Sequence, residues 1–115
     1  IKWIIESEAL IDNEIIDICQ LIRDVVIDNF GQNNAHNVFV KSSTGFYISP
    51  DSATNGATVS AIKLMLDNSS PLPVKASGGI RNIVDFKTMV DLGVKRIGTS
   101  SALSILHGKQ FDSNY

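Results

Sequence analysis

The feature that most constrains this chain is a fourfold alternation of short apolar segments with longer segments whose apolar residues recur every three or four positions. Short runs rich in Ile and Val are typical of buried strands, and the three-to-four spacing predicts amphipathic helices. The predicted strands are residues 2–7, 38–41, 73–76 and 94–98, and the predicted helices are residues 14–30, a segment beginning after Thr58, residues 82–92 and residues 102–106. The order βαβαβαβα predicts a parallel sheet covered by helices, so the fold class is α/β.

Each of the three longer helices has one apolar face that we expect to be buried. These faces comprise Ile15, Ile18, Leu21, Ile22, Val25, Val26 and Phe30 in the first helix, Val59, Ile62, Leu64 and Met65 in the second, and Ile83, Phe86, Met89 and Val90 in the third. Thr58 and Asn82 are expected to cap the second and third helices, and Gly31 and Gly93 to end the first and third.

The size of the repeating unit distinguishes two α/β architectures. Each unit takes roughly 29 residues, so eight units would need about 230, close to the ~250 residues of a (β/α)8 barrel. An open doubly wound sheet is disfavoured because neither Gly-x-Gly-x-x-Gly after the first strand nor a P-loop pattern is present. The chain also enters an apolar run at Ile1. We therefore expect residues 1–115 to be a single domain segment: the carboxyl-terminal half of a TIM barrel, strands five to eight with their helices and a polar tail.

Composition excludes several classes of protein. With 43% apolar and 19% charged residues the chain is too apolar to be disordered, and no run of about 18 apolar residues could span a membrane. A net charge of −2 without a basic block argues against nucleic acid as a partner. The single cysteine, Cys19, and the lack of a signal-like beginning favour a reducing cytoplasm.

Two lysines end neighbouring predicted strands. Lys41 closes the second strand and Lys75 lies near the end of the third, where barrel enzymes place their active sites. A neighbouring cation lowers the pKa of an amine and makes it nucleophilic, so paired lysines suggest Schiff-base chemistry. The alternative is that each lysine only extends into solvent, which is the commoner case for a lone strand-end lysine.

Two glycine-containing loops follow the last two strands. Ser77 to Arg81 contains Gly78 and Gly79, and Gly98 to Ser101 adds hydroxyl groups to a similar turn. Backbone N–H groups without a Cβ in the way can approach an anion, and the last two loops of a barrel commonly bind phosphate. A plain turn, with Arg81 in a surface ion pair, remains the alternative for each loop.

The amino-acid sequence of these segments resembles that of the carboxyl-terminal half of the deoxyribose-phosphate aldolase family. The resemblance runs from Ile4 to Ser101, and the specific phrases are residues 38–46, 56–59, 63–65, 74–81 and 96–101. It implies a class I aldolase that interconverts 2-deoxy-D-ribose 5-phosphate with D-glyceraldehyde 3-phosphate and acetaldehyde, in deoxyribonucleotide and carbohydrate catabolism, without metal or cofactor.

The resemblance also implies a role for each matching residue. Lys41 matches the Schiff-base lysine and Lys75 the second lysine that keeps its neighbour deprotonated, while Tyr115 matches a terminal tyrosine that assists proton transfer. The implied substrate and phosphate contacts are Thr44, Gly45, Gly78, Gly79, Arg81, Gly98, Ser100 and Ser101. Phe46 stands where some members carry a phosphate-side lysine, and the loop after it is longer than usual.

The expected partners are a small sugar phosphate, acetaldehyde and the amino-terminal half of the barrel, with a homodimer as an open alternative and neither nucleic acid nor membrane involved. Two other functions stay open. One is a catalytically silent half-barrel that binds a sugar phosphate or pairs with another half. The other is a different lysine-dependent sugar-phosphate aldolase, such as a relative of class I fructose-bisphosphate aldolase.

Overall fold

The computed structural model describes residues 1–48, 50 and 56–107 of the chain. Its elements are β1 (Lys2–Ile4), η1 (Ser7–Ala9), α1 (Asp12–Phe30), η2 (Gln32–Asn37), β2 (Phe39–Lys41), α2 (Val59–Ser69), β3 (Val74–Ser77), α3 (Ile83–Leu92), β4 (Arg96–Gly98) and α4 (Ala102–Leu106). The strands form one sheet in the order β1-β2-β3-β4, with every neighbouring pair parallel. The predicted α/β class and the βαβαβαβα order are confirmed.

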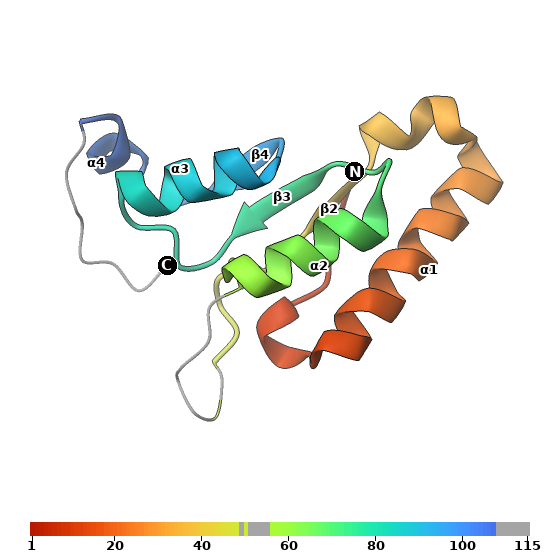
Figure 1. Ribbon diagram of the computed structural model, residues 1–115, viewed down its shortest axis with the longest axis horizontal. Coiled ribbons are helices and arrows are strands. Elements are labelled where there is room, and N and C mark those ends of the chain that lie inside the picture. Colours follow the sequence, from red (N-terminus) through yellow and green to blue (C-terminus); the bar gives the residue numbers. More distant parts are fainter. Residues whose placement is uncertain (49, 51–55, 108–115) are drawn as a thin grey trace.

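The spatial order of the strands equals their order in the sequence. A doubly wound sheet reverses direction at a switch point, whereas strands that follow one another in a single sense are those of a barrel wall. The helices follow the same order, since α2 lies between α1 and α3 and packs on both (Figure 1). The described strands and helices therefore form a segment of barrel wall.

The two faces of the sheet differ in burial. Val40, Val74 and Ala76 point to the helical side and are fully buried. Because side chains alternate along a strand and parallel partners point the same way, Lys41 and Lys75 lie on the opposite face. This second face corresponds to the interior of a barrel, so the fold places both lysines there.

The buried stripe of α1 is narrower than predicted. Ile15, Cys19, Ile22 and Val26 form it, whereas Leu21, Val25 and Phe30 are 58%, 45% and 61% exposed. The prediction that these three are buried is wrong. Leu21 and Val25 each precede a buried residue by one position, which turns them about 100° around the helix, and Phe30 lies in the last turn.

Two further apolar positions are exposed contrary to prediction. Val59, in the first turn of α2, is 42% exposed, and Val90 of α3 is 48% exposed. Each helix buries only the stripe that meets the sheet and its neighbouring helices, with Met65 and Met89 at the centres of those stripes.

Local signals at the helix ends behave as predicted. The Thr58 hydroxyl accepts from the Ala61 N–H at 3.2 Å, and the Asn82 side chain accepts from the Asp85 N–H at 2.9 Å. Gly93 ends α3 in the left-handed region, with φ 111°. The first strand, however, stops at Ile4 rather than Ser7, because Glu6 adopts a left-handed backbone that breaks the extended run.

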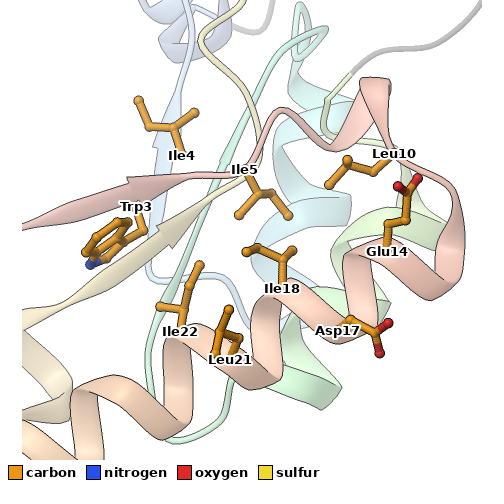
Figure 2. Close-up of a pocket in the computed structure, with 9 residues that line it drawn as sticks. All are labelled: Trp3, Ile4, Ile5, Leu10, Glu14, Asp17, Ile18, Leu21 and Ile22. Carbon is orange, nitrogen blue, oxygen red and sulfur yellow. The ribbon is translucent and has the colours of Figure 1, made fainter.

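A groove of about 490 Å³ separates the free side of β1 from α1 (Figure 2). Ile5, Ile18 and Ile22 point toward one another within it, while Ile4 points away from the helix. Trp3 lines the groove and is 53% exposed, so this edge strand is less buried than predicted. Within the described residues, no helix is both long and apolar enough to cross a membrane.

Candidate active site

Lys41 and Lys75 are direct neighbours across the β2–β3 ladder. Their Cα atoms are register partners in a parallel pair, and adjacent strands lie about 4.8 Å apart. Both side chains are half-buried. This register places the two lysines side by side on adjacent strands.

The pKa of the Lys75 ammonium is lowered from its ordinary value. Desolvation by burial is the largest cause, followed by the positive charges of Lys41, Lys2 and Arg96. The ladder pairs Lys75 with Arg96 on its other side, and the Arg96 guanidinium lies 4.2 Å from the centre of the Phe39 ring. A row of cations thus crosses this face, and it favours the uncharged form of the Lys75 amine.

Hydrogen bonds between buried serines join the carboxyl ends of β2 and β3, next to the two lysines. The Ser42 hydroxyl donates to the Ser77 carbonyl at 2.6 Å and accepts from the Ser77 N–H at 2.9 Å. In return, the Ser77 hydroxyl donates to the Ser43 carbonyl at 2.7 Å. All three serines are fully buried. These bonds fix the offset between β2 and β3, and with it the relative position of Lys41 and Lys75.

Gly56 closes over the same strand ends and has no room for a side chain. A Cβ at Gly56 would lie 2.2 Å from the Ser43 Cβ and 2.8 Å from the Ser77 carbonyl oxygen. The Ser7 hydroxyl donates to the Gly56 carbonyl at 2.7 Å, and the Ala57 N–H donates to the Gly78 carbonyl at 3.1 Å. The backbone at residue 56 therefore packs directly on the ends of β2 and β3.

Two carboxylates hold the turn that follows Lys41. Glu6 accepts from the Thr44 N–H and from the Thr44 hydroxyl, the second at 2.8 Å, and Glu8 accepts from the Ser43 hydroxyl. Sequence reasoning did not identify either glutamate. The available signal was their position at the end of the predicted first strand and just beyond it, where polar side chains reach the same edge of the sheet as Lys41.

Thr44 and Gly45 lie where the sequence placed them, immediately beyond the end of β2. Gly45 has φ 84°, a left-handed conformation that favours glycine, and its N–H donates to the Ser43 hydroxyl at 2.8 Å. Thr44 is half-buried, so part of its surface can meet a ligand.

The two glycine loops meet at the ends of β3 and β4. Gly78 and Gly79 have φ 96° and 84°, and Gly98 is the ladder partner of Ser77. The Thr99 hydroxyl donates to the Ile80 carbonyl at 2.6 Å and so ties one loop to the other. Ser100 and Ser101 continue the second loop into α4.

Two polar atoms in these loops are buried and lack a hydrogen-bond partner within the described residues: the Arg81 Nε and the Ser101 hydroxyl oxygen. Gly79 and Arg81 also line a polar groove of about 360 Å³ together with Asp85, whose carboxylate accepts from the Arg81 N–H at 3.4 Å. The loops thus offer donors to an anion, with one carboxylate close by. Tyr115 lies outside the described residues.

In the part of the chain that the structure describes, no three His, Cys, Asp or Glu side chains gather as metal ligands. The arrangement consists of an amine of lowered pKa beside a second amine, a hydroxyl held by a carboxylate, and glycine loops with free donors. Such a set can attack a carbonyl and hold a phosphate nearby.

Comparison with known proteins supports the resemblance read from the sequence. Over 116 residues, covering all of this chain, it is 40% identical to the deoxyribose-phosphate aldolase of Lactococcus lactis and 42% identical to that of Lysinibacillus sphaericus. No family model matches the chain. The chain spans about half the length of these curated relatives, 46% and 45% respectively.

Solved structures give the same result. The tetrameric deoxyribose phosphate aldolase of Aeropyrum pernix matches 92% of this chain and 39% of its own, with a TM-score of 0.66 and 30% sequence identity. A Coccidioides immitis structure of the same name matches 92% of this chain and 37% of its own, with a TM-score of 0.65 and 34% identity. Together with the parallel sheet, these matches confirm that the fold is half of an α/β barrel.

Proposed function

Because this chain resembles the deoxyribose-phosphate aldolase family along its whole length, we propose that it carries the catalytic lysines of a class I aldolase. The reaction is the reversible cleavage of 2-deoxy-D-ribose 5-phosphate to D-glyceraldehyde 3-phosphate and acetaldehyde. The observation that carries this proposal is the ladder pairing of Lys41 with Lys75 on the interior face.

Lys41 is the nucleophile of the proposed reaction. Its neutral amine adds to the aldehyde carbon C1 of the open-chain sugar and loses water, which forms an iminium ion. The C3 hydroxyl then loses its proton, the C2–C3 bond breaks, and its electron pair moves into the iminium to give an enamine. Protonation of the enamine at C2 and hydrolysis of the imine release acetaldehyde and return Lys41.

Lys75 helps by charge and by proton transfer. Its lowered pKa lets it exchange a proton near neutral pH more readily than an ordinary lysine. Its positive charge, when present, lies beside the reacting amine, because Lys41 and Lys75 are ladder partners. Tyr115 is proposed to assist proton transfer at the enamine carbon.

The phosphate group is proposed to bind at the two glycine loops. The support is a pair of buried donors, Arg81 Nε and Ser101 Oγ, which have no hydrogen-bond partner among the described residues. Gly78 and Gly79, in the first of these two loops, both have positive φ. Gly45, Gly98 and Ser100 are proposed to contribute to the same phosphate site, and Thr44 is proposed to contact the rest of the substrate.

The proposed partner of this half-barrel is a set of complementary βα units that pair with β1 and β4, the outer strands of the described sheet. A homodimer that closed the barrel would place two copies of the cationic row, Lys2, Lys41, Lys75 and Arg96, in one interior, and like charges oppose that arrangement. The catabolic role in the cytoplasm is part of the same proposal.

Borohydride trapping tests the proposal. Full-length protein is incubated with acetaldehyde, reduced and digested, and the adduct is located by mass spectrometry. We expect a two-carbon adduct on the peptide bearing Lys41 and none in Lys41→Met. An adduct on Lys75 alone would refute the assignment, and protein that binds the sugar phosphate without any adduct would favour the silent half-barrel. Trapping with dihydroxyacetone phosphate instead of acetaldehyde would favour a fructose-bisphosphate aldolase relative.

A further inference from the structure

Glu6 has a left-handed backbone conformation, which is unusual for a residue other than glycine. Its φ of 52° and ψ of 60° are left-handed, and no other non-glycine residue of the described chain has a positive φ. This conformation is sterically unfavourable for a residue with a Cβ. Residues held in such regions cluster at functional sites, where surrounding contacts enforce them.

The contacts that enforce it run to the turn after Lys41. One Glu6 oxygen accepts from the Thr44 N–H at 2.5 Å, and the other accepts from the Thr44 hydroxyl at 2.8 Å. The Ile5 N–H donates to the Lys41 carbonyl at 3.0 Å, so the chain around Glu6 runs alongside the end of β2. The left-handed turn aims the carboxylate across this boundary at Thr44.

The Thr44 hydroxyl therefore already makes two hydrogen bonds within the protein. It donates its one hydrogen to Glu6, and it accepts from the Phe46 N–H at 3.2 Å. A hydroxyl has one hydrogen and two lone pairs, so a single lone pair remains for a ligand. With its one hydrogen given to Glu6, the Thr44 hydroxyl can only accept a hydrogen bond from a ligand.

The same pattern occurs at the preceding residue. The Ser43 hydroxyl donates to Glu8 and accepts from the Gly45 N–H at 2.8 Å. Ser43 is fully buried, however, whereas Thr44 is half-buried and retains surface for a ligand. Glu8 therefore serves as a matched comparison, since it acts on a hydroxyl that no substrate can reach.

We propose that Glu6 is a positioning residue that holds the Thr44 hydroxyl as an acceptor and thereby selects a substrate with a hydroxyl beside its reacting carbonyl. The inference rests on the proposed aldolase function. In the direction of synthesis, the acceptor substrate is a phosphorylated three-carbon aldehyde. Its carbonyl and its dianionic phosphate can only accept hydrogen bonds, so its one hydroxyl is the only group that can donate to Thr44.

The test compares two acceptor aldehydes in the full-length protein: glyceraldehyde 3-phosphate and its analogue with fluorine in place of the hydroxyl. Fluorine cannot donate, and the difference in intrinsic reactivity cancels when one ratio is compared between variants. In Glu6→Gln the amide oxygen still accepts from the Thr44 N–H, so the amide NH₂ group donates to the Thr44 hydroxyl oxygen. The hydroxyl hydrogen of Thr44 is then free to point at a ligand. We expect the preference in kcat/KM for hydroxyl over fluorine to fall about tenfold in Glu6→Gln.

The control variants are Glu8→Gln and Asp28→Asn, an exposed carboxylate on α1. Both should keep the wild-type preference within twofold. Glu6→Gly relieves the left-handed backbone, so it tests the lost contact without added strain, and it should lose the preference as Glu6→Gln does. Thr44→Val, which keeps Glu6, should lose it as well.

Acetaldehyde trapping on Lys41 tests the aldolase proposal independently of the role of Glu6, because acetaldehyde has no hydroxyl that could bind to Thr44. We expect its yield to stay within twofold in both Glu6 variants. If trapping is intact but the preference is unchanged in Glu6→Gly, in Glu6→Gln or in Thr44→Val, the role of Glu6 is refuted while the aldolase proposal stands. If the wild type gives no adduct, the aldolase proposal itself fails.

Discussion

Removal of the Ser42 hydroxyl is the most direct test of how the site is held together. That hydroxyl donates to the Ser77 carbonyl at 2.6 Å and accepts from the Ser77 N–H at 2.9 Å, and both residues are fully buried. In Ser42→Ala the Ser77 N–H and the Ser77 carbonyl both lose this hydrogen-bond partner, and water cannot replace it because the site is buried. A buried polar group without a partner costs about 1–3 kcal/mol, so with two such groups the variant should lose about 2–6 kcal/mol of stability.

The free energy of unfolding is measured by urea denaturation of the full-length protein, with Ser60→Ala as the control. Ser60 is exposed in the first turn of α2, where alanine changes helix propensity by no more than about 0.5 kcal/mol. Because the same bonds fix the offset of Lys41 and Lys75, we also expect kcat to fall at a urea concentration where the variant remains folded. A loss of stability no larger than that of Ser60→Ala would refute the reasoning.

Three further predictions follow from the same structure. Gly56→Ala should lose about 1–3 kcal/mol by overpacking, because its Cβ would lie 2.2 Å from the Ser43 Cβ, and urea denaturation equal to wild type would contradict this. The pKa of Lys75 is lower in the folded protein than its ordinary value of 10.5, so the free energy of unfolding should increase as the pH rises from the lowered pKa toward 10.5. Lys75→Met should reduce this increase, which is measured by comparing unfolding curves at pH 7 and pH 10. Cys19 is fully buried with a pKa raised to about 11, so iodoacetamide at pH 8 should label it only in urea, and labelling of the folded protein at the unfolded rate would argue against this environment.

The number and order of the strands and helices follow from the sequence alone, because hydrophobic period is a local property. The lysines at the ends of the second and third strands and the glycines behind them were recognisable for the same reason. Caps at Thr58 and Asn82 were also predictable, since the residue and its hydrogen-bond partner lie within one helical turn.

Exposure could not be read from the helical period in the same way. The apolar stripe of α1 contains Leu21 and Val25 as well as Ile22 and Val26, yet only the second pair is buried. Which of two adjacent apolar positions meets the sheet depends on the rotation of the helix about its axis, and packing against other elements sets that rotation.

The carboxylate contacts to Thr44 were decided only by the tertiary structure. Glu6 and Thr44 are 38 positions apart, and they meet because β1 and β2 pair in one register and because the backbone turns left-handed at Glu6. The serine bonds between residues 42 and 77 depend in the same way on the offset of β2 and β3. Strand register and a strained dihedral angle result from the balance of contacts over the whole sheet, and no local pattern of residues encodes them.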